Sequence, residues 1–177
     1  MNQGAVFEAM NMAAAWSLPV LFIIENNQYG MGTHIKRVTS VEKLSQRAKA
    51  FDMKNSEVDG MNVLKVYAEC SKIAETMRET HEPYLLEVNT YRYKGHSVSD
   101  PGFYRSKEEL KSYEEKDPIL SLAHILKESH GLTEVSLKEF DNEIKSKVKK
   151  AEEEASSAAW PQNSEAFTDV YSDGFLF

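Results

Sequence analysis

One segment predicts the fold class: Leu18-Pro19-Val20-Leu21-Phe22-Ile23-Ile24-Glu25-Asn26-Asn27-Gln28-Tyr29-Gly30. Its residues 20–24 are apolar without a break, which is typical of a strand buried on both faces of a parallel sheet. The run then ends abruptly in acidic and amide side chains. Because open α/β sheets bind ligands beyond the carboxyl ends of their strands, the segment predicts a strand at 19–25 and a ligand site directly after it.

The residues after this strand offer hard oxygen ligands. The side-chain oxygens of Asn26 and Asn27, with nearby backbone carbonyls, suit Mg²⁺ or Ca²⁺ and the phosphates that such ions carry. The same Asn-Asn-x-x-Gly pattern is also common turn chemistry, and the local sequence alone favours a simple turn. The cation site and the simple turn can be told apart only from the wider sequence pattern of the chain.

Composition limits the class of protein. A chain of 177 residues with 41% hydrophobic and 28% charged residues is long enough for one domain with its own core. No apolar run approaches the roughly 20 residues that span a bilayer, and no signal-type leader is expected. Cys70 is the single cysteine, which excludes an intrachain disulfide and a cysteine zinc cluster and favours a reducing compartment.

The net charge of −7 comes entirely from residues 106–177, since residues 1–105 carry equal numbers of acidic and basic side chains. This acidity argues against binding to nucleic acid. A solvated helical surface is the simplest interpretation of these charges.

Apolar periodicity predicts the elements of the first part of the chain. The expected elements are helices at 3–16, 41–50 (capped by Thr39 or Ser40) and 62–80, a short strand and turn at 58–60, and a strand at 83–93. Strand, helix and strand in this order indicate a parallel, doubly wound sheet. We therefore predict an α/β domain over residues 1–105, with Cys70 as a packed core thiol.

Residues 106–177 predict a helical extension of the same domain. Ser106 and Glu109 fit a capping box, in which each side chain bonds to the backbone of the other. The expected helices run from 106 to about 115, from 118 to 131, and from 133 or 136 to about 160. The apolar tail of Phe167, Val170, Tyr171 and Phe175–Phe177 either docks on a partner or frays.

A second polar segment follows the strand at 83–93: Lys94-Gly95-His96-Ser97-Val98-Ser99-Asp100-Pro101-Gly102-Phe103-Tyr104-Arg105. Its two glycines and one proline predict a loop. A loop histidine is usually just solvated, but His96 follows the carboxyl end of a strand, where it can exchange a proton or hydrogen-bond a phosphate. No Gly-x-Ser-x-Gly or His-x-x-x-His pattern accompanies it, so we expect neither a hydrolase nor a zinc site.

Four short segments share one further pattern: Asn2-Gln3-Gly4, Glu8–Ala13, Leu18-Pro19 and Glu25-Asn26-Asn27. They resemble the second half of the thiamine diphosphate motif, whose opening Gly-Asp-Gly would lie just upstream of Met1. The loop Tyr91–Gly102, together with Asp117-Pro118-Ile119, is similar to the phosphorylation loop region of pyruvate dehydrogenase α subunits. These belong to the thiamine diphosphate-dependent 2-oxo acid dehydrogenase family.

The resemblance implies a partial doubly wound parallel sheet of the thiamine diphosphate-binding fold with a helical C-terminal region. It also implies that the Asn27 side chain and the Tyr29 carbonyl hold Mg²⁺, and that Gly30 and His96 contact the cofactor. His96 corresponds to the active-site loop histidine of the family.

The same resemblance implies roles for three further residues of the loop and for one residue before it. Ser97 corresponds to the main regulatory phosphoserine, where a phosphate would add about −1.5 to −2 charge beside His96. The second phosphoserine of the family has no counterpart, because the loop is one residue shorter there, which favours a bacterial source. Arg92, Asp100 and Arg105 are expected to order the loop.

The implied function is oxidative decarboxylation of pyruvate, with acetyl transfer to the lipoyl group of an acyltransferase. The implied partner is a β subunit in an α2β2 heterotetramer, without nucleic acid or membrane. We expect a bacterial cytoplasm, or a mitochondrial matrix if the chain is a eukaryotic fragment.

Three alternatives stay open. The absent Gly-Asp-Gly and upstream segment fit a truncated, catalytically incompetent subunit that only binds a partner, because one carboxylate ligand fewer weakens Mg²⁺ binding. The same absence also fits a fragment whose other half is supplied as a separate chain. A branched-chain or acetoin-type 2-oxo acid dehydrogenase is the third. We predict that this chain alone has no oxidative decarboxylase activity.

Overall fold

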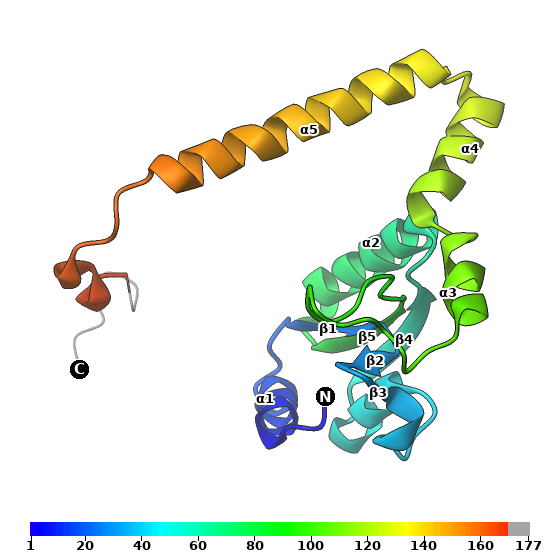
Figure 1. Ribbon diagram of the computed structural model, residues 1–177. Helices are drawn as coiled ribbons and strands as arrows, with labels where there is room; N and C mark the ends of the chain where they lie inside the picture. Colours follow the sequence, from blue (N-terminus) through cyan, green and yellow to red (C-terminus); the bar gives the residue numbers. More distant parts are fainter. Residues whose placement is uncertain (170–177) are drawn as a thin grey trace. The chain divides into compact units, whose positions relative to one another are not determined.

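A computed structural model describes residues 1–169 (Figure 1). The chain divides into two compact units, Met1–Leu126 and Lys127–Phe177. The expected boundary between residues 105 and 106 stays a prediction. No helix within the described residues has the length and the apolar composition needed to cross a membrane.

The first unit is built on a parallel three-stranded sheet. Its strands are β1 (Leu21–Asn26), β4 (Lys54–Asp59) and β5 (Tyr84–Asn89), in the spatial order β1-β5-β4. The register pairs Asn26 with Asn89 and Asp59 with the same Asn89, so all three strands end together at one edge of the sheet. This arrangement confirms the expected α/β class.

Apolar side chains cover both faces of the central strand β5. Leu85 and Leu86 are adjacent and fully buried, and they point to opposite faces because successive strand residues alternate. Leu85 joins a cluster with residues of α1 (Gly4–Ala15) and of the 3-10 helix η2 (Leu44–Phe51). Leu86 joins a cluster with α2 (Val63–Thr80), which lies against the other face (Figure 1). Helices from both sides of the sheet therefore form the core.

Strand β1 is less buried than its sequence indicates. It pairs only with β5, and α2 contacts β4 and β5. Ile24 is buried, whereas Ile23 is 57% exposed and Glu25 is exposed. The expectation of burial on both faces is therefore wrong for the described residues, because β1 is an edge strand.

Other elements also differ from the expected ones, among them the short strand expected at 58–60, which is the six-residue strand β4. The helix expected at 41–50 is the 3-10 helix η2, which begins after Lys43 without a side-chain cap from Thr39 or Ser40. The Asn-Asn turn after β1 leads into a short hairpin of β2 (Tyr29–Gly30) and β3 (Thr33–His34), which the sequence did not predict, and then into the 3-10 turn η1 (Ile35–Arg37). Strand β5 stops at Asn89 rather than 93, because its neighbours β1 and β4 end in register with it.

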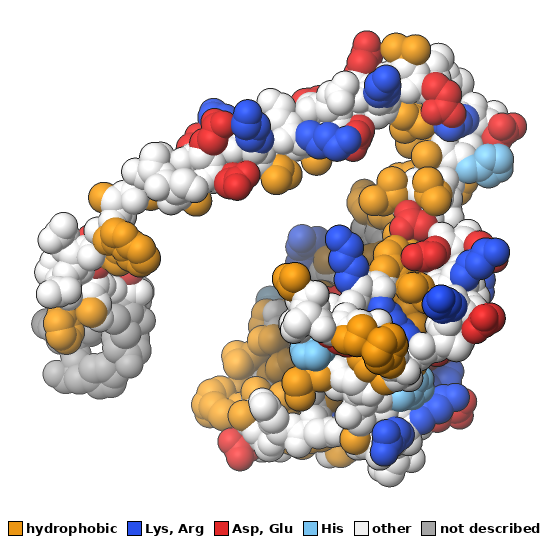
Figure 2. Space-filling model, viewed as in Figure 1, with side chains coloured by type: hydrophobic (Ala, Val, Ile, Leu, Met, Phe, Trp, Pro, Cys, Tyr) orange, Lys and Arg blue, Asp and Glu red, His pale blue; other side chains and the backbone are white. Residues whose placement is uncertain are grey.

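Helices follow the loop as expected. They are α3 (Lys107–Glu114), α4 (Pro118–His130), α5 (Glu134–Ser157) and the 3-10 turn η3 (Asn163–Phe167). Thr133 caps α5, and Gly131 ends α4 with a positive φ of 65°. No residue of α5 is buried, and acidic and basic side chains alternate along it (Figure 2). The part of the expected apolar tail at 170–177 lies outside the described residues.

Candidate cofactor site

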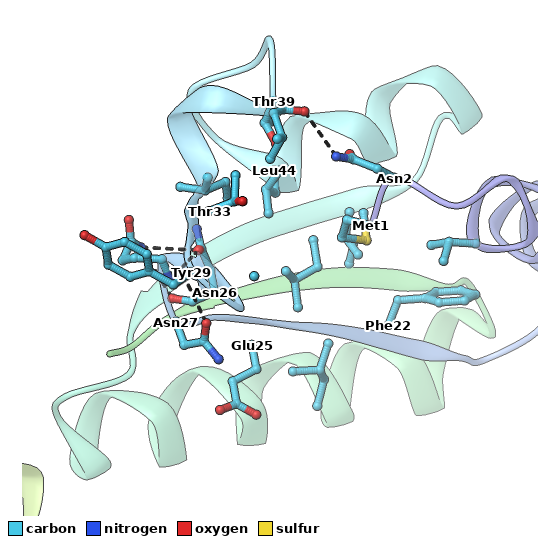
Figure 3. A pocket seen from close by; sticks show the side chains of 18 residues that line it. Met1, Asn2, Phe22, Glu25, Asn26, Asn27, Tyr29, Thr33, Thr39 and Leu44 are labelled. Carbon is cyan, nitrogen blue, oxygen red and sulfur yellow. Dashed lines mark hydrogen bonds between the residues drawn. The ribbon is translucent and has the colours of Figure 1, made fainter. Parts of the chain in front are cut away.

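A pocket of about 740 Å³ lies along β1 and the turn that follows it (Figure 3). Asn27, Tyr29 and Gly30, three of the residues expected to bind cofactor or metal, all line it. Figure 3 shows Asn27 and Tyr29 close together at one end and Phe22 at the other. His96 does not line this pocket. The structure therefore brings the expected turn residues together but leaves the histidine outside their pocket.

The turn is held by hydrogen bonds that the side-chain oxygens of its two asparagines accept. The Tyr29 backbone N–H donates to the Asn27 side-chain oxygen at 3.3 Å, and the Gln28 N–H donates to the Asn26 side-chain oxygen at 3.3 Å. Gln28 has a positive φ of 72°, a conformation that non-glycine residues adopt rarely. An amide oxygen has two lone pairs, so the Asn27 oxygen keeps one for a ligand.

A buried carboxylate lies beneath this turn. Glu87 on β5 is 1% exposed, and its two oxygens accept from the Asn26 side-chain amide and from the Ser45 backbone N–H, both at 2.8 Å. Burying a carboxylate is costly unless it is hydrogen-bonded, and here each oxygen has a donor. Glu87 is not among the site residues expected from the sequence, although a charge in the middle of an apolar strand was a usable signal.

A second carboxylate holds the turn from the side. The hydroxyls of Tyr29 and Tyr91 both donate to Glu109 Oε1 at 2.9 Å, and the Tyr29 hydroxyl lies 3.2 Å from Oε2. Burial, followed by the bond to Glu109, raises the pKa of Tyr29 to about 12. The Glu109 backbone N–H donates to Ser106 as expected, but its side chain binds the tyrosines. The reciprocal half of the expected capping box is therefore wrong.

Asp100 organises the loop around His96. One oxygen of Asp100 accepts from the His96 backbone N–H at 2.9 Å and lies 2.6 Å from His96 Nδ1. The other oxygen accepts from the Gly102 N–H at 2.9 Å. These backbone N–H groups hold the pKa of Asp100 well below its usual range. Because a carboxylate can only accept, Nδ1 carries the proton, which leaves Nε2 of the exposed His96 ring for a substrate.

Arg92 and Tyr104 connect the loop to the tip of the β2–β3 hairpin, which follows the Asn-Asn turn. The Arg92 guanidinium donates to the Met31 carbonyl at 2.6 Å and to the Tyr104 hydroxyl at 3.0 Å. A Cβ on Gly32 would lie 3.0 Å from the Tyr104 ring, so the ring would have to shift by a few tenths of an ångström to accept a side chain there. Arg105 donates to the carbonyls of Arg92 and Tyr93. The ordering roles of Arg92, Asp100 and Arg105 stay predictions, which these contacts support.

Ser97 lies at the exposed tip of this loop, with its hydroxyl 3.2 Å from that of Ser99. Within residues 1–169, no three His, Cys, Asp or Glu side chains are arranged to hold a metal ion. The two cation ligands expected in the turn, the Asn27 side-chain oxygen and the Tyr29 carbonyl, are neutral oxygens. Mg²⁺ accepts such a partial set, because it usually keeps several waters and binds phosphate oxygens as well.

The fold belongs to the α/β class with a parallel sheet, and its oxygen-rich turn and His–Asp loop follow strands at the edge where such sheets bind ligands. Residues 1–164 match a family model described as "Dehydrogenase E1 component". The chain therefore belongs to the dehydrogenase E1 component family.

Several bacterial and mitochondrial proteins are similar over nearly the whole chain. "Pyruvate dehydrogenase E1 component subunit alpha" of Rickettsia bellii is 44% identical over 170 residues, which are 96% of this chain and 52% of that protein. The protein of the same name from Rhizobium meliloti is 43% identical over 96% of this chain and 49% of its own length. The mitochondrial protein of Dictyostelium discoideum is 42% identical over 96% and 45%. The chain spans about half the length of these relatives.

Proposed function

We propose that this chain is the C-terminal portion of the α subunit of a pyruvate dehydrogenase. The intact enzyme would decarboxylate pyruvate oxidatively and pass the acetyl group to the lipoyl group of an acyltransferase. The observation that carries the proposal is the identity of 44% to a pyruvate dehydrogenase α subunit over 96% of this chain. The names of the relatives favour pyruvate over the branched-chain and acetoin alternatives.

The turn after β1 is the proposed cation half-site. The dehydrogenase E1 family generally depends on thiamine diphosphate, which supplies the electron sink for decarboxylation when it is bound. The Asn27 side-chain oxygen and the Tyr29 carbonyl would hold the Mg²⁺ that carries the diphosphate, with Gly30 beside them. A carboxylate ligand would come from outside the described residues.

His96 is the proposed catalytic group of this chain. Asp100 orients its ring so that Nε2 is available to donate or accept a proton at the substrate. A phosphate on the adjacent Ser97 would place about −1.5 to −2 charge beside the Asp100 carboxylate. Repulsion between these anions would displace His96 and stop turnover.

The remaining assignments follow from the same proposal. A β subunit would complete the cofactor site in an α2β2 assembly, and the acyltransferase would accept the acetyl group. Residues 1–105 would form the cofactor-binding region and residues 106–177 its helical extension. The location would be a bacterial cytoplasm or a mitochondrial matrix.

Turnover with pyruvate tests the proposal. Because the chain spans about half of its relatives, the test completes it with the N-terminal half of the Rickettsia bellii relative in one chain, called here the completed α subunit, and pairs this with a β subunit. With pyruvate, thiamine diphosphate, Mg²⁺ and an artificial electron acceptor, we expect turnover by the pair and none by the 177-residue chain alone.

A matched pair of histidine variants gives the control. His96→Ala should abolish turnover, whereas the exposed His124→Ala on α4 should not. Binding of cofactor without turnover in the paired protein would overturn the proposal and favour a subunit that only binds its partner.

A further inference from the structure

We infer that Glu109 is a positioning residue, which fixes the direction of the Tyr29 carbonyl and thereby the affinity and selectivity of the cation site. The inference rests on the proposed function, because that function makes this carbonyl a ligand. Glu109 lies 80 positions from Tyr29 in the chain and touches neither cation nor substrate in this role.

The first observation is the direction of the Glu109 side chain. Glu109 is the third residue of α3, where the Ser106-x-x-Glu pattern would let it bond back to the start of the helix. Instead it accepts the hydroxyls of Tyr29 and Tyr91. The first turn of α3 therefore lacks the capping bond from the Glu109 side chain, which instead accepts hydrogen bonds from the two tyrosines.

The second observation is that the Tyr29 ring is held on several sides. Tyr29 is 8% exposed, and the His34 ring packs edge-on against it at a centroid distance of 5.0 Å. The Tyr91 and Tyr104 rings lie at 6.2 and 5.3 Å. A tyrosine side chain has only two rotatable bonds, so a fixed ring and a fixed hydroxyl leave the residue little freedom.

The third observation is that the backbone of Tyr29 is held as well. Tyr29 pairs with His34 across the β2–β3 hairpin, and its N–H donates to the Asn27 side chain. Both ends of Tyr29 are therefore anchored. Among the described residues, Glu109 is the only hydrogen-bond partner of the Tyr29 hydroxyl. Without the bond to Glu109, ring packing is the remaining restraint on the hydroxyl end of Tyr29, so the ring and the backbone carbonyl should both move more.

Cation size separates this role from a merely structural one. Mg²⁺ demands near-ideal octahedral geometry, whereas Ca²⁺ accepts longer and more variable ligand distances. A carbonyl that can rotate should therefore weaken Mg²⁺ binding more than Ca²⁺ binding. Simple loss of packing between α3 and the sheet would weaken both equally.

The test uses the completed α subunit paired with its β subunit. Calorimetry measures the affinity for Mg²⁺ and for Ca²⁺ in the presence of thiamine diphosphate, in Glu109→Ala, Tyr29→Phe and the double variant. Alanine removes both acceptor oxygens of Glu109, whereas glutamine would keep one of them. Glu108→Ala is the matched control, because Glu108 is the exposed neighbour on the same helix. Hydrogen exchange of the amides of residues 27–31 is measured without ligand.

We expect Glu109→Ala to weaken Mg²⁺ binding about 10-fold, the lower end of the range for residues that support metal ligands, and Ca²⁺ binding by clearly less. The double variant should match Tyr29→Phe, and the turn amides should exchange faster in Glu109→Ala than in Glu108→Ala. Equal losses for both cations, or exchange equal to that of Glu108→Ala, would overturn the inference. Absence of cation binding by the unmutated protein would instead overturn the proposed function, and the exchange result would still decide whether Glu109 fixes the turn.

Discussion

Replacing Glu87 with glutamine should destabilise the fold far more than loss of one charge on the surface. The two carboxylate oxygens of Glu87 accept one N–H each, from Asn26 and from Ser45, at 2.8 Å. A glutamine keeps one acceptor and replaces the other with an NH₂ group, so that one donor must face another donor. Flipping the Asn26 amide would only move the conflict, because its oxygen also accepts from the Gln28 N–H.

The magnitude follows from these contacts. A buried donor without an acceptor costs about 1–3 kcal/mol, and a hydrogen bond to a charged group is worth about 1 kcal/mol more than a neutral one. We therefore expect Glu87→Gln to lower the free energy of unfolding by about 2–4 kcal/mol. Since unfolding of a small protein in urea has a slope of about 1–3 kcal/mol per molar, the midpoint should fall by roughly 1–2 M.

Urea denaturation followed by circular dichroism measures this shift. Glu25→Gln is the matched control, because Glu25 is an exposed glutamate on the neighbouring strand β1. Its change should stay within about 0.5 kcal/mol, as for most surface substitutions. Equal midpoints for the two variants would refute the reasoning that the Glu87 carboxylate holds the sheet and the turn together.

Two further predictions concern the pKa shifts. Because the folded-state pKa of Asp100 is lowered, its stabilisation of the loop is present above the usual aspartate pKa of about 4 and is lost as the pH falls below it. Asp100→Asn should expose the loop to trypsin at neutral pH, and a cleavage rate equal to that of a Ser99→Ala control would contradict this. Burial, and then the bonds to Glu109 and Asp117, raise the pKa values of Tyr29 and Tyr93 to about 12, so their stabilisation is full below pH of about 10 and is lost toward pH 12. Tyrosinate absorbance should show a late-titrating fraction that shrinks in Tyr93→Phe, and a single step near pH 10 for every tyrosine would show the shifts to be absent.

Much of the fold was predictable because its signals are local. The apolar period of 62–80 predicted a helix, and the observed helix α2 is Val63–Thr80. The order of strand, helix and strand predicted a parallel sheet, which the β1-β5-β4 order confirms. The segment after β1 indicated a ligand site from its amide side chains, and it lines the pocket.

The missed features depend on contacts between distant residues. The Ser106-x-x-Glu109 pattern satisfies a local rule, and nothing near it shows that the Glu109 side chain binds a tyrosine 80 positions away. The apolar run of β1 could not reveal an edge strand, because apolar composition is the same whichever neighbours a strand has. The hairpin after Asn27 has strands of two residues each, too short for an alternating pattern to appear.

The most direct test of the central claim is the affinity of the turn after β1 for Mg²⁺ and thiamine diphosphate. Calorimetry on the completed α subunit with its β subunit would compare Asn27→Ala with Asn142→Ala, an exposed asparagine on α5. We predict that Asn27→Ala weakens binding at least 10-fold, since it removes a direct ligand, and that Asn142→Ala leaves it unchanged. Equal affinity in both variants would contradict the assignment of this turn as the cation half-site.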